Sequence, residues 1–166
     1  MKIKKCRICN SKNFFDLFTL GKLSFTGKFP KNLKDKIPKD FISLVMCKKC
    51  KLVQLDRNFN PNYLYSHDYG YRTGINSTMT KHVEYVAKEA VKISKLKKHE
   101  YVLDIASNDG TLLNFYDRKF ITVGIDPLIN KYKKYYNRIN FKVSNFFSLK
   151  ELKKKRLNFK YKIISA

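Results

Sequence analysis

The sequence predicts an α/β fold for the second half of the chain, preceded by a small β-rich module. A short apolar run bounded by charge, Tyr101–Ile105, is typical of a buried parallel strand. Turn-forming residues follow at 107–110, and apolar residues at helical spacing begin at Leu112. Strand, polar turn and helix make the first unit of an open sheet, and such sheets bind ligands where their strands end.

The next strand, Ile121–Ile125, ends at an acidic residue, Asp126, which lies 22 residues after Asp104. A carboxylate at this place can accept both hydroxyls of a ribose, so the pattern favours a nucleoside cofactor. The glycine-rich fingerprint of dinucleotide folds is absent, and a carboxylate in the turn repels a pyrophosphate. The acidic turn therefore favours S-adenosylmethionine (SAM) over NAD. The alternative is an ordinary βαβ unit that binds no ligand.

Helices and strands on both sides of these two strands extend the α/β pattern. Upstream, apolar residues from Met79 to Ile93 fall on one helical face, Thr78 or Thr80 could cap this helix, and His82 lies on or near it. Downstream we expect a basic helix at 129–138, a strand at 141–143, a Lys-rich helix at 149–157 and a strand at 161–166.

All four cysteines of the chain lie in two C-x-x-C pairs, Cys6 with Cys9 and Cys47 with Cys50. Each pair presents two sulfurs on a tight turn, and four thiolates satisfy tetrahedral Zn²⁺. Because protein sulfurs would fill every position, we expect a structural zinc site that allows a short segment to fold. The alternatives are a redox pair or unligated core cysteines.

The segment around the cysteine pairs has the pattern of a small β-rich module. Residues 14–20, 41–46 and 52–55 are predicted as strands, and residues 21–38 carry the glycines and prolines of a loop. A tyrosine-rich connector at 67–78 suits a polar substrate such as a sugar, or it is a packed linker. We therefore expect three parts: a zinc-binding module at 1–66, a connector and helix at 67–100, and the nucleoside-binding fold at 101–166.

The formal net charge of +23 arises from 36 Lys and Arg against 13 Asp and Glu. Lysines are scattered along the chain, and Lys, Asn, Ile, Tyr and Phe are over-used together, which indicates a composition bias more than a nucleic-acid-binding face. No apolar stretch approaches the ~18 residues of a membrane span, and no apolar segment of a signal peptide follows the charged start. We expect a cytoplasmic protein with no membrane partner.

Several motifs occur in a fixed order after the first cysteine pair. They are the second pair with Leu-Val-Gln-Leu, Tyr-Gly-Tyr-Arg-x-Gly at 69–74, Asp-Ile-x-Ser-Asn-Asp-Gly-Thr-Leu-Leu at 104–113 and Val-Gly-Ile-Asp-Pro at 123–127. Together they resemble the sugar C-methyltransferases, which carry an N-terminal zinc-binding domain ahead of a Rossmann-like class I methyltransferase domain. The resemblance implies methyl transfer from SAM to carbon 3 of a nucleotide-linked keto-deoxysugar.

The resemblance also implies roles for individual residues. Those that would hold SAM are Asp104, Ser107, Asn108 and Gly110 on its methionine and ribose side, Asp126 at the ribose hydroxyls and Asn145 near the adenine. Tyr69 or Tyr71 would approach the reacting sugar as the catalytic tyrosine. Ala106 departs from the family, which has glycine there, and its methyl group narrows the turn against the cofactor.

The family's sheet has more strands than the roughly four predicted here, and its catalytic base lies beyond the last of them. We therefore expect an N-terminal fragment of a methyltransferase, inactive alone, with a nucleotide-sugar substrate and a second chain that completes the sheet. Two hypotheses compete: a zinc-ribbon adaptor that binds nucleic acid, and a non-catalytic subunit that supplies SAM-binding residues to a partner. Only nucleic-acid binding should weaken steeply with salt.

Overall fold

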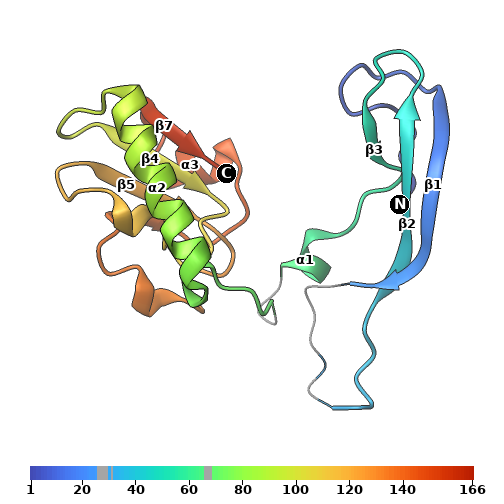
Figure 1. The fold of residues 1–166 in the computed structure, drawn as a ribbon, viewed down its shortest axis with the longest axis horizontal. Coiled ribbons are helices and arrows are strands. Elements are labelled where there is room, and N and C mark those ends of the chain that lie inside the picture. Colours follow the sequence, from blue (N-terminus) through green and yellow to red (C-terminus); the bar gives the residue numbers. More distant parts are fainter. Residues whose placement is uncertain (26–29, 31, 66–68) are drawn as a thin grey trace. The chain divides into compact units, whose positions relative to one another are not determined.

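The computed structural model describes residues 1–25, 30, 32–65 and 69–166. The chain divides into two compact units, Met1–Gly70 and Tyr71–Ala166, termed the N-terminal unit and the C-terminal unit (Figure 1). The loop expected at 21–38 and the connector expected at 67–78 fall partly outside the described residues, and the three-part division of the chain stays a prediction. No helix in the described ranges is long and apolar enough to cross a membrane.

The N-terminal unit is a three-stranded antiparallel sheet of β1 (Phe14–Ser24), β2 (Lys39–Cys47) and β3 (Val53–Leu55), in the order β1-β2-β3. The small β-rich region predicted from the sequence is thus confirmed. β1 runs further than predicted because Gly21 adopts a φ of +78° beside a register irregularity between Thr19 and Lys22. The glycine absorbs the irregularity, and the strand continues into the expected loop.

Aromatic residues pack where the chain leaves this sheet. A short helix, α1 (Pro61–Leu64), follows β3, and Pro61 at its first position has the φ angle that a helix start requires. The Tyr63 ring stacks on the buried ring of Phe25 at a centroid distance of 6.2 Å, and Phe59 meets Phe25 edge-on at 5.5 Å. These contacts hold the last part of the N-terminal unit against Phe25, the residue that follows β1.

The C-terminal unit is built on a four-stranded parallel sheet, as the sequence predicted. Its strands are β4 (Tyr101–Ile105), β5 (Ile121–Ile125), β6 (Phe141–Val143) and β7 (Tyr161–Ser165), in the order β6-β5-β4-β7. The chain moves outward from β4 to β6 and then returns to the other side of β4. The strand order therefore reverses beside β4, which is where open α/β sheets bind ligands.

Helices cover both faces of the parallel sheet. One face buries Leu103, Val123 and Ile125, which pack against Leu152 of α3 (Leu149–Lys154). The long helix α2 (Ser77–Ser94) crosses the sheet in front of β4 and β5 (Figure 1), and its buried residue is the small Ala87. The mixed α/β architecture follows from strands that are apolar on both faces.

Two of the expected helices are not α-helices. The apolar pattern that begins at Leu112 yields only a 3₁₀ turn, η2 (Leu113–Phe115), and residues 129–138 yield only η3 (Lys133–Tyr135). The first connection has no room for a longer helix, because a turn at Asp117 and Phe120 already leads into β5. The second carries closely spaced lysines, whose mutual repulsion disfavours a short helix.

The start and orientation of α2 also differ from the expectation. Asn76 caps the helix, with its side-chain oxygen accepting from the Met79 N–H at 3.0 Å, so neither Thr78 nor Thr80 is the cap. The helix turns Ala87 towards the core and leaves Met79 and Ile93 of the predicted apolar face exposed. His82 lies on the helix and is exposed, as a surface residue would be.

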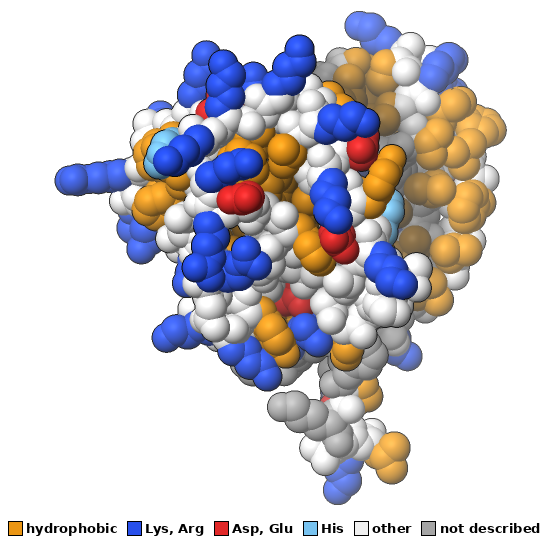
Figure 2. Space-filling view, turned by 60° about the vertical axis from the view of Figure 1, so that its left-hand side comes forward, with side chains coloured by type: hydrophobic (Ala, Val, Ile, Leu, Met, Phe, Trp, Pro, Cys, Tyr) orange, Lys and Arg blue, Asp and Glu red, His pale blue; other side chains and the backbone are white. Residues whose placement is uncertain are grey.

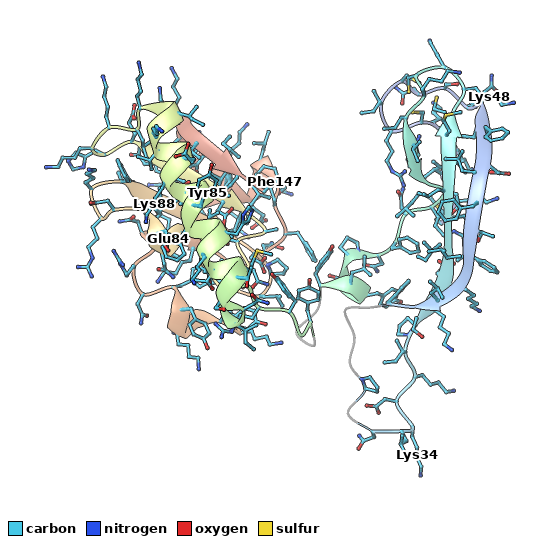
Figure 3. The ribbon with its side chains drawn as sticks, in the orientation of Figure 1. Lys34, Lys48, Glu84, Tyr85, Lys88 and Phe147 are labelled. Carbon is cyan, nitrogen blue, oxygen red and sulfur yellow. The ribbon has the colours of Figure 1, made fainter. Side chains whose placement is uncertain are left out.

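Cationic side chains are spread over the surface of the protein. Figure 2 shows Lys and Arg distributed across the visible face, with acidic side chains among them. On the outward side of α2, Lys88 donates to Glu84 at 2.7 Å, and Tyr85 lies between them in sequence (Figure 3). Such exposed pairs contribute little to stability, and the scattered charge agrees with a composition bias.

Candidate functional site

The four cysteines of the N-terminal unit meet at one point. Their sulfur atoms all lie within 4.8 Å of one another, and two pairs, Cys6 with Cys50 and Cys9 with Cys47, are 3.6 and 3.5 Å apart. A tetrahedral ZnS₄ centre has sulfur–sulfur separations of roughly 3.8 Å, given Zn–S bonds of about 2.3 Å. The donor set and its spacing therefore fit Zn²⁺ with every coordination position filled by protein.

The two cysteine pairs adopt the same local fold. The carbonyl of Cys6 accepts from the Asn10 N–H at 3.1 Å, and that of Cys47 accepts from the Lys51 N–H at 2.9 Å. Asn10 and Lys51 both have left-handed backbone angles, with φ of 58° and 62°. In each pair the N–H groups two and three residues later point at the first sulfur, which is how a tight turn presents two sulfurs together.

These N–H groups favour the thiolate form of the first cysteine in each pair. The Cys9 N–H is the main cause that lowers the pKa of Cys6 to about 6, and the Cys50 N–H lowers the pKa of Cys47 in the same way. Cys50 differs: the Leu52 N–H lowers its pKa, but burial and the neighbouring thiols outweigh this and raise it to about 12. Four thiolates this close need a cation among them, which is what a divalent metal supplies.

Gln54 and Arg7 support the metal centre through contacts that the sequence did not predict. Gln54 of β3 is buried and donates from Nε2 to the Cys6 sulfur at 3.3 Å. Arg7, inside the first pair, donates from Nη1 to Gln54 Oε1 at 3.0 Å and so fixes the orientation of that amide. Such partners orient metal ligands. Lys48 extends outward from the second pair (Figure 3), where its charge offsets that of a thiolate centre.

The second candidate site is an acidic corner where β4 and β5 run towards their carboxyl ends. Asp104 of β4 is 7% exposed and accepts from Ser165 Oγ at 2.6 Å. Asp126 follows β5, is 6% exposed and accepts from the N–H groups of Leu128 at 2.7 Å and Asn108 at 3.0 Å. No Lys or Arg in the described part of the chain forms an ion pair with either carboxylate.

Burial raises the pKa of both carboxyl groups. For Asp104, burial is the main cause and the charge of Asp126 adds to it, against the hydrogen bond from Ser165, so that the pKa rises to about 6. For Asp126, burial outweighs the two N–H hydrogen bonds and raises the pKa. The corner thus holds two negative charges that repel each other, and a positively charged ligand would relieve this repulsion.

The turn after β4, residues 106–110, is termed the β4 turn, and it has an unusual backbone. Ala106, Asn108 and Gly110 have φ values of 58°, 48° and 74°, in the left-handed region. Ala106 is exposed and tolerates a conformation that glycine adopts without strain. At Ser107 the side-chain oxygen lies 2.9 Å from the hydroxyl of the buried Tyr136, which donates in turn to the Asn108 carbonyl at 2.9 Å.

The predicted cofactor residues do not all lie in the same environment. Ser107, Asn108 and Gly110 share the β4 turn with both carboxylates nearby, but the Asn108 side chain is engaged by residues 71–73. Asn145 is exposed after β6, where its side-chain oxygen accepts from the Phe146 N–H at 2.8 Å. The roles of these residues in holding a cofactor stay predictions.

The two candidate catalytic tyrosines fall in different units. Tyr69 belongs to the N-terminal unit, where its ring lies edge-on to Tyr65 at 5.4 Å. Tyr71 begins the C-terminal unit, and its carbonyl accepts from Asn108 Nδ2 at 3.2 Å and from the Tyr132 hydroxyl at 3.1 Å. Tyr71 thus contacts the β4 turn through its backbone carbonyl.

An apolar cavity of about 330 Å³ lies on the α3 side of the same sheet. Ile105 and Ile164 line it near the carboxyl ends of β4 and β7, and Phe147, which follows β6, lines it as well (Figure 3). Its walls offer almost no polar groups, so it could hold a flat apolar or aromatic group but could not fix a charged one.

Comparison with known proteins supports the cysteine assignment. Residues 6–65 match the family model Methyltransf_13, whose description is "Putative zinc binding domain". The matched region contains all four cysteines and ends before the C-terminal unit. Together with the sulfur geometry, the match supports Zn²⁺ as the metal of the N-terminal unit.

A curated relative extends the similarity into the second unit. An alignment of 131 residues, which covers 77% of this chain, is 24% identical to C-methyltransferase NovU of Streptomyces niveus. The resemblance to C-methyltransferases is therefore confirmed. The aligned region spans only 31% of the length of the relative, so the comparison shows a similarity to a methyltransferase, and the activity of the whole relative does not transfer to this chain.

Proposed function

We propose that the C-terminal unit binds SAM as the N-terminal part of a Rossmann-like class I methyltransferase. The observation that carries the proposal is the acidic corner, where the buried carboxylates of Asp104 and Asp126 have hydrogen-bond partners but no cationic partner among the described residues. The sulfonium of SAM is a cation attached to a nucleoside, so it supplies both the positive charge and the ribose that this corner suits.

The same corner disfavours a dinucleotide. A pyrophosphate needs bare N–H groups, yet the Asn108 N–H already donates to Asp126 at 3.0 Å and the Thr111 N–H to Asp109 at 3.1 Å. Two carboxylates without a cation would also repel phosphate charge. In the proposed complex Asp126 holds the ribose hydroxyls through its remaining lone pairs, and Asp104 supplies negative charge on the methionine side.

The acceptor we propose is a nucleotide-linked keto-deoxysugar that is methylated on carbon. Support comes from the similarity to a C-methyltransferase and from Tyr71, which is held against the β4 turn. SAM would supply an electrophilic methyl group. Tyr71 would contact the sugar beside it, while a base that removes the proton next to the ketone is not among the candidate residues. The zinc centre would stabilise the N-terminal unit and take no part in the chemistry.

The sheet also offers an edge for additional strands. β7 pairs with β4 along one side, no strand in the described residues pairs with its other side, and Ile164 on it is 61% exposed. We propose that strands from a second chain pair with this edge and extend the sheet. Size-exclusion analysis with a candidate partner segment would show a complex if this holds, and no change in elution would contradict it.

Equilibrium dialysis with labelled SAM tests the binding proposal directly. The wild-type chain should bind SAM, and Asp126→Asn should weaken binding at least about tenfold, because the substitution removes a charge-assisted hydrogen-bond acceptor. Asp117→Asn is the matched control, since Asp117 is an exposed aspartate outside the corner. Equal loss of binding in both variants, or no loss in either, would contradict the assignment.

A further inference from the structure

The segment at the start of the C-terminal unit, residues 71–75, is tied closely to the β4 turn. It contains the 3₁₀ turn η1 (Thr73–Ile75). The Thr73 N–H donates to Asn108 Oδ1 at 2.9 Å, and Asn108 Nδ2 donates to the Tyr71 carbonyl at 3.2 Å. The oxygen and the nitrogen of the Asn108 side-chain amide thus both hydrogen-bond to the 71–75 segment.

A buried ion pair makes the second attachment. Asp109 is 0% exposed, and its Oδ2 accepts from Arg72 Nη1 and from the Gly74 N–H, each at 3.0 Å. Its Oδ1 accepts from the Thr111 N–H at 3.1 Å and the Thr111 hydroxyl at 2.6 Å. Both oxygens of Asp109 are therefore fully used, and Arg72 is the cation that balances its charge.

The 71–75 segment approaches Asp109 and Thr111 closely at Gly74. A Cβ atom at Gly74 would lie 2.5 Å from Thr111 Oγ1 and 2.9 Å from Asp109 Oδ2, so only glycine allows so close an approach. On its other side the Arg72 guanidinium stacks over the Tyr135 ring at 4.4 Å from the centroid. Planar stacking combined with a charged hydrogen bond is a use of Arg that Lys does not reproduce.

The β4 turn needs such support. Ala106 and Asn108 both adopt left-handed backbone angles, and non-glycine residues keep that conformation only when their surroundings impose it. The side chain of Asn108 and the side chain of Asp109 are both held by the 71–75 segment. The segment therefore imposes the conformation in which the Asn108 N–H donates to Asp126.

We propose that Arg72 is a positioning residue that sets the β4 turn for cofactor binding and fixes Tyr71 beside it. The inference rests on the proposed function and adds a coupling to it. Through Asn108 and Asp109, the conformation of the β4 turn depends on the 71–75 segment, which carries Tyr71. Arg72 touches neither cofactor nor acceptor in this scheme. It acts through Asp109 and the peptide groups of residues 73 and 74.

The test compares four variants of the full chain by calorimetric titration with SAM. Arg72→Ala removes the cation, Arg72→Lys keeps its charge and loses the planar stack, and Arg72→Ala with Asp109→Asn removes both charges, so that no buried carboxylate is left unbalanced. Arg118→Ala is the control, because Arg118 is an exposed arginine of the same unit. Unfolding midpoints and backbone amide exchange without ligand are recorded for each.

Loss of Arg72 should weaken SAM binding about tenfold to a hundredfold, the range produced by losing one hydrogen bond to a charged group. Arg72→Lys should bind SAM more tightly than Arg72→Ala while the two variants have the same unfolding midpoint. A merely structural role would not produce this combination. SAM affinity of all Arg72 variants equal to that of Arg118→Ala would overturn the proposal.

Amide exchange tests the positioning role of Arg72 even if SAM does not bind the wild-type chain. Absence of SAM binding would refute the proposed function. The Gly74, Asn108 and Thr111 amides should then still exchange about tenfold faster in Arg72→Ala than in Arg118→Ala, because opening of the β4 turn would cost less free energy. Equal exchange at these amides would overturn the positioning role independently of the ligand.

Discussion

Replacement of Asp104 by asparagine should stabilise this protein at neutral pH and lower its affinity for the proposed ligand, SAM. Asp104 is 7% exposed within β4, and its pKa rises from 3.8 to about 6, mainly because burial disfavours the charged form. A rise of that size corresponds to about 3 kcal/mol of folding free energy lost when the group is ionised. Asparagine has nearly the same shape and can still accept from Ser165 Oγ.

The sign of the pH dependence follows from the two pKa values. Below about pH 3.8 the carboxyl is protonated in both the folded and unfolded states, so the wild-type chain carries no penalty. Between about 3.8 and 6 the unfolded state ionises first, and the penalty grows until it is complete above about pH 6. Asp104→Asn should therefore raise the free energy of unfolding by up to about 3 kcal/mol at pH 8 and by little at pH 4.

Urea unfolding of the wild-type chain and of Asp104→Asn at these two pH values measures the difference. Asp117→Asn, at an exposed aspartate, should change stability by only about 0.5 kcal/mol at either pH. A variant at position 104 that is less stable than wild type at pH 8, or a gain of equal size at both pH values, would show that Asp104 is not a buried, penalised carboxylate.

The remaining predictions concern the acidic corner, the four cysteines and the 71–75 segment. SAM affinity should fall as the pH drops through about 6, where Asp104 takes up a proton and the corner loses negative charge; titration calorimetry between about pH 5 and 8 measures this, and a flat profile would exclude Asp104 from binding. A strong chelator, or Cys47→Ser, should remove zinc and unfold the N-terminal unit, seen as loss of metal by atomic absorption and loss of strand signal by circular dichroism; an unchanged spectrum would mean the fold does not need the metal. Gly74→Ala should destabilise the chain by about 1–3 kcal/mol in urea unfolding, because its Cβ would meet Thr111 Oγ1 at 2.5 Å, and a neutral effect would show that the 71–75 segment is less tightly packed than described.

The strands and the metal ligands could be predicted because their signals are local. The short apolar run of β4 and the two C-x-x-C pairs need no knowledge of distant residues, and both stand where they were expected. Asp126 was singled out for the same reason, since an acid that ends a strand is visible in the sequence, and the structure places it in the acidic corner with Asp104.

The missed contacts at the two candidate sites join residues far apart in the chain. Arg72 and Asp109 are 37 residues apart, and Gln54 donates to a sulfur 48 residues away, so no periodic pattern reveals either contact. The helix expected after the β4 turn failed for a related reason: apolar spacing was present, but the length of the connection to β5 decided the outcome. Helix α2 shows a smaller error, in which Asn76 outcompetes the threonines as the cap.

The central claim, that the acidic corner receives a sulfonium nucleoside, is tested most directly by competitive calorimetry on the zinc-loaded chain. SAM should bind saturably with one site per chain, and prior addition of NAD should leave that titration unchanged. Saturable binding of NAD that blocks SAM, or folded protein that releases no heat with SAM at any concentration, would contradict the account.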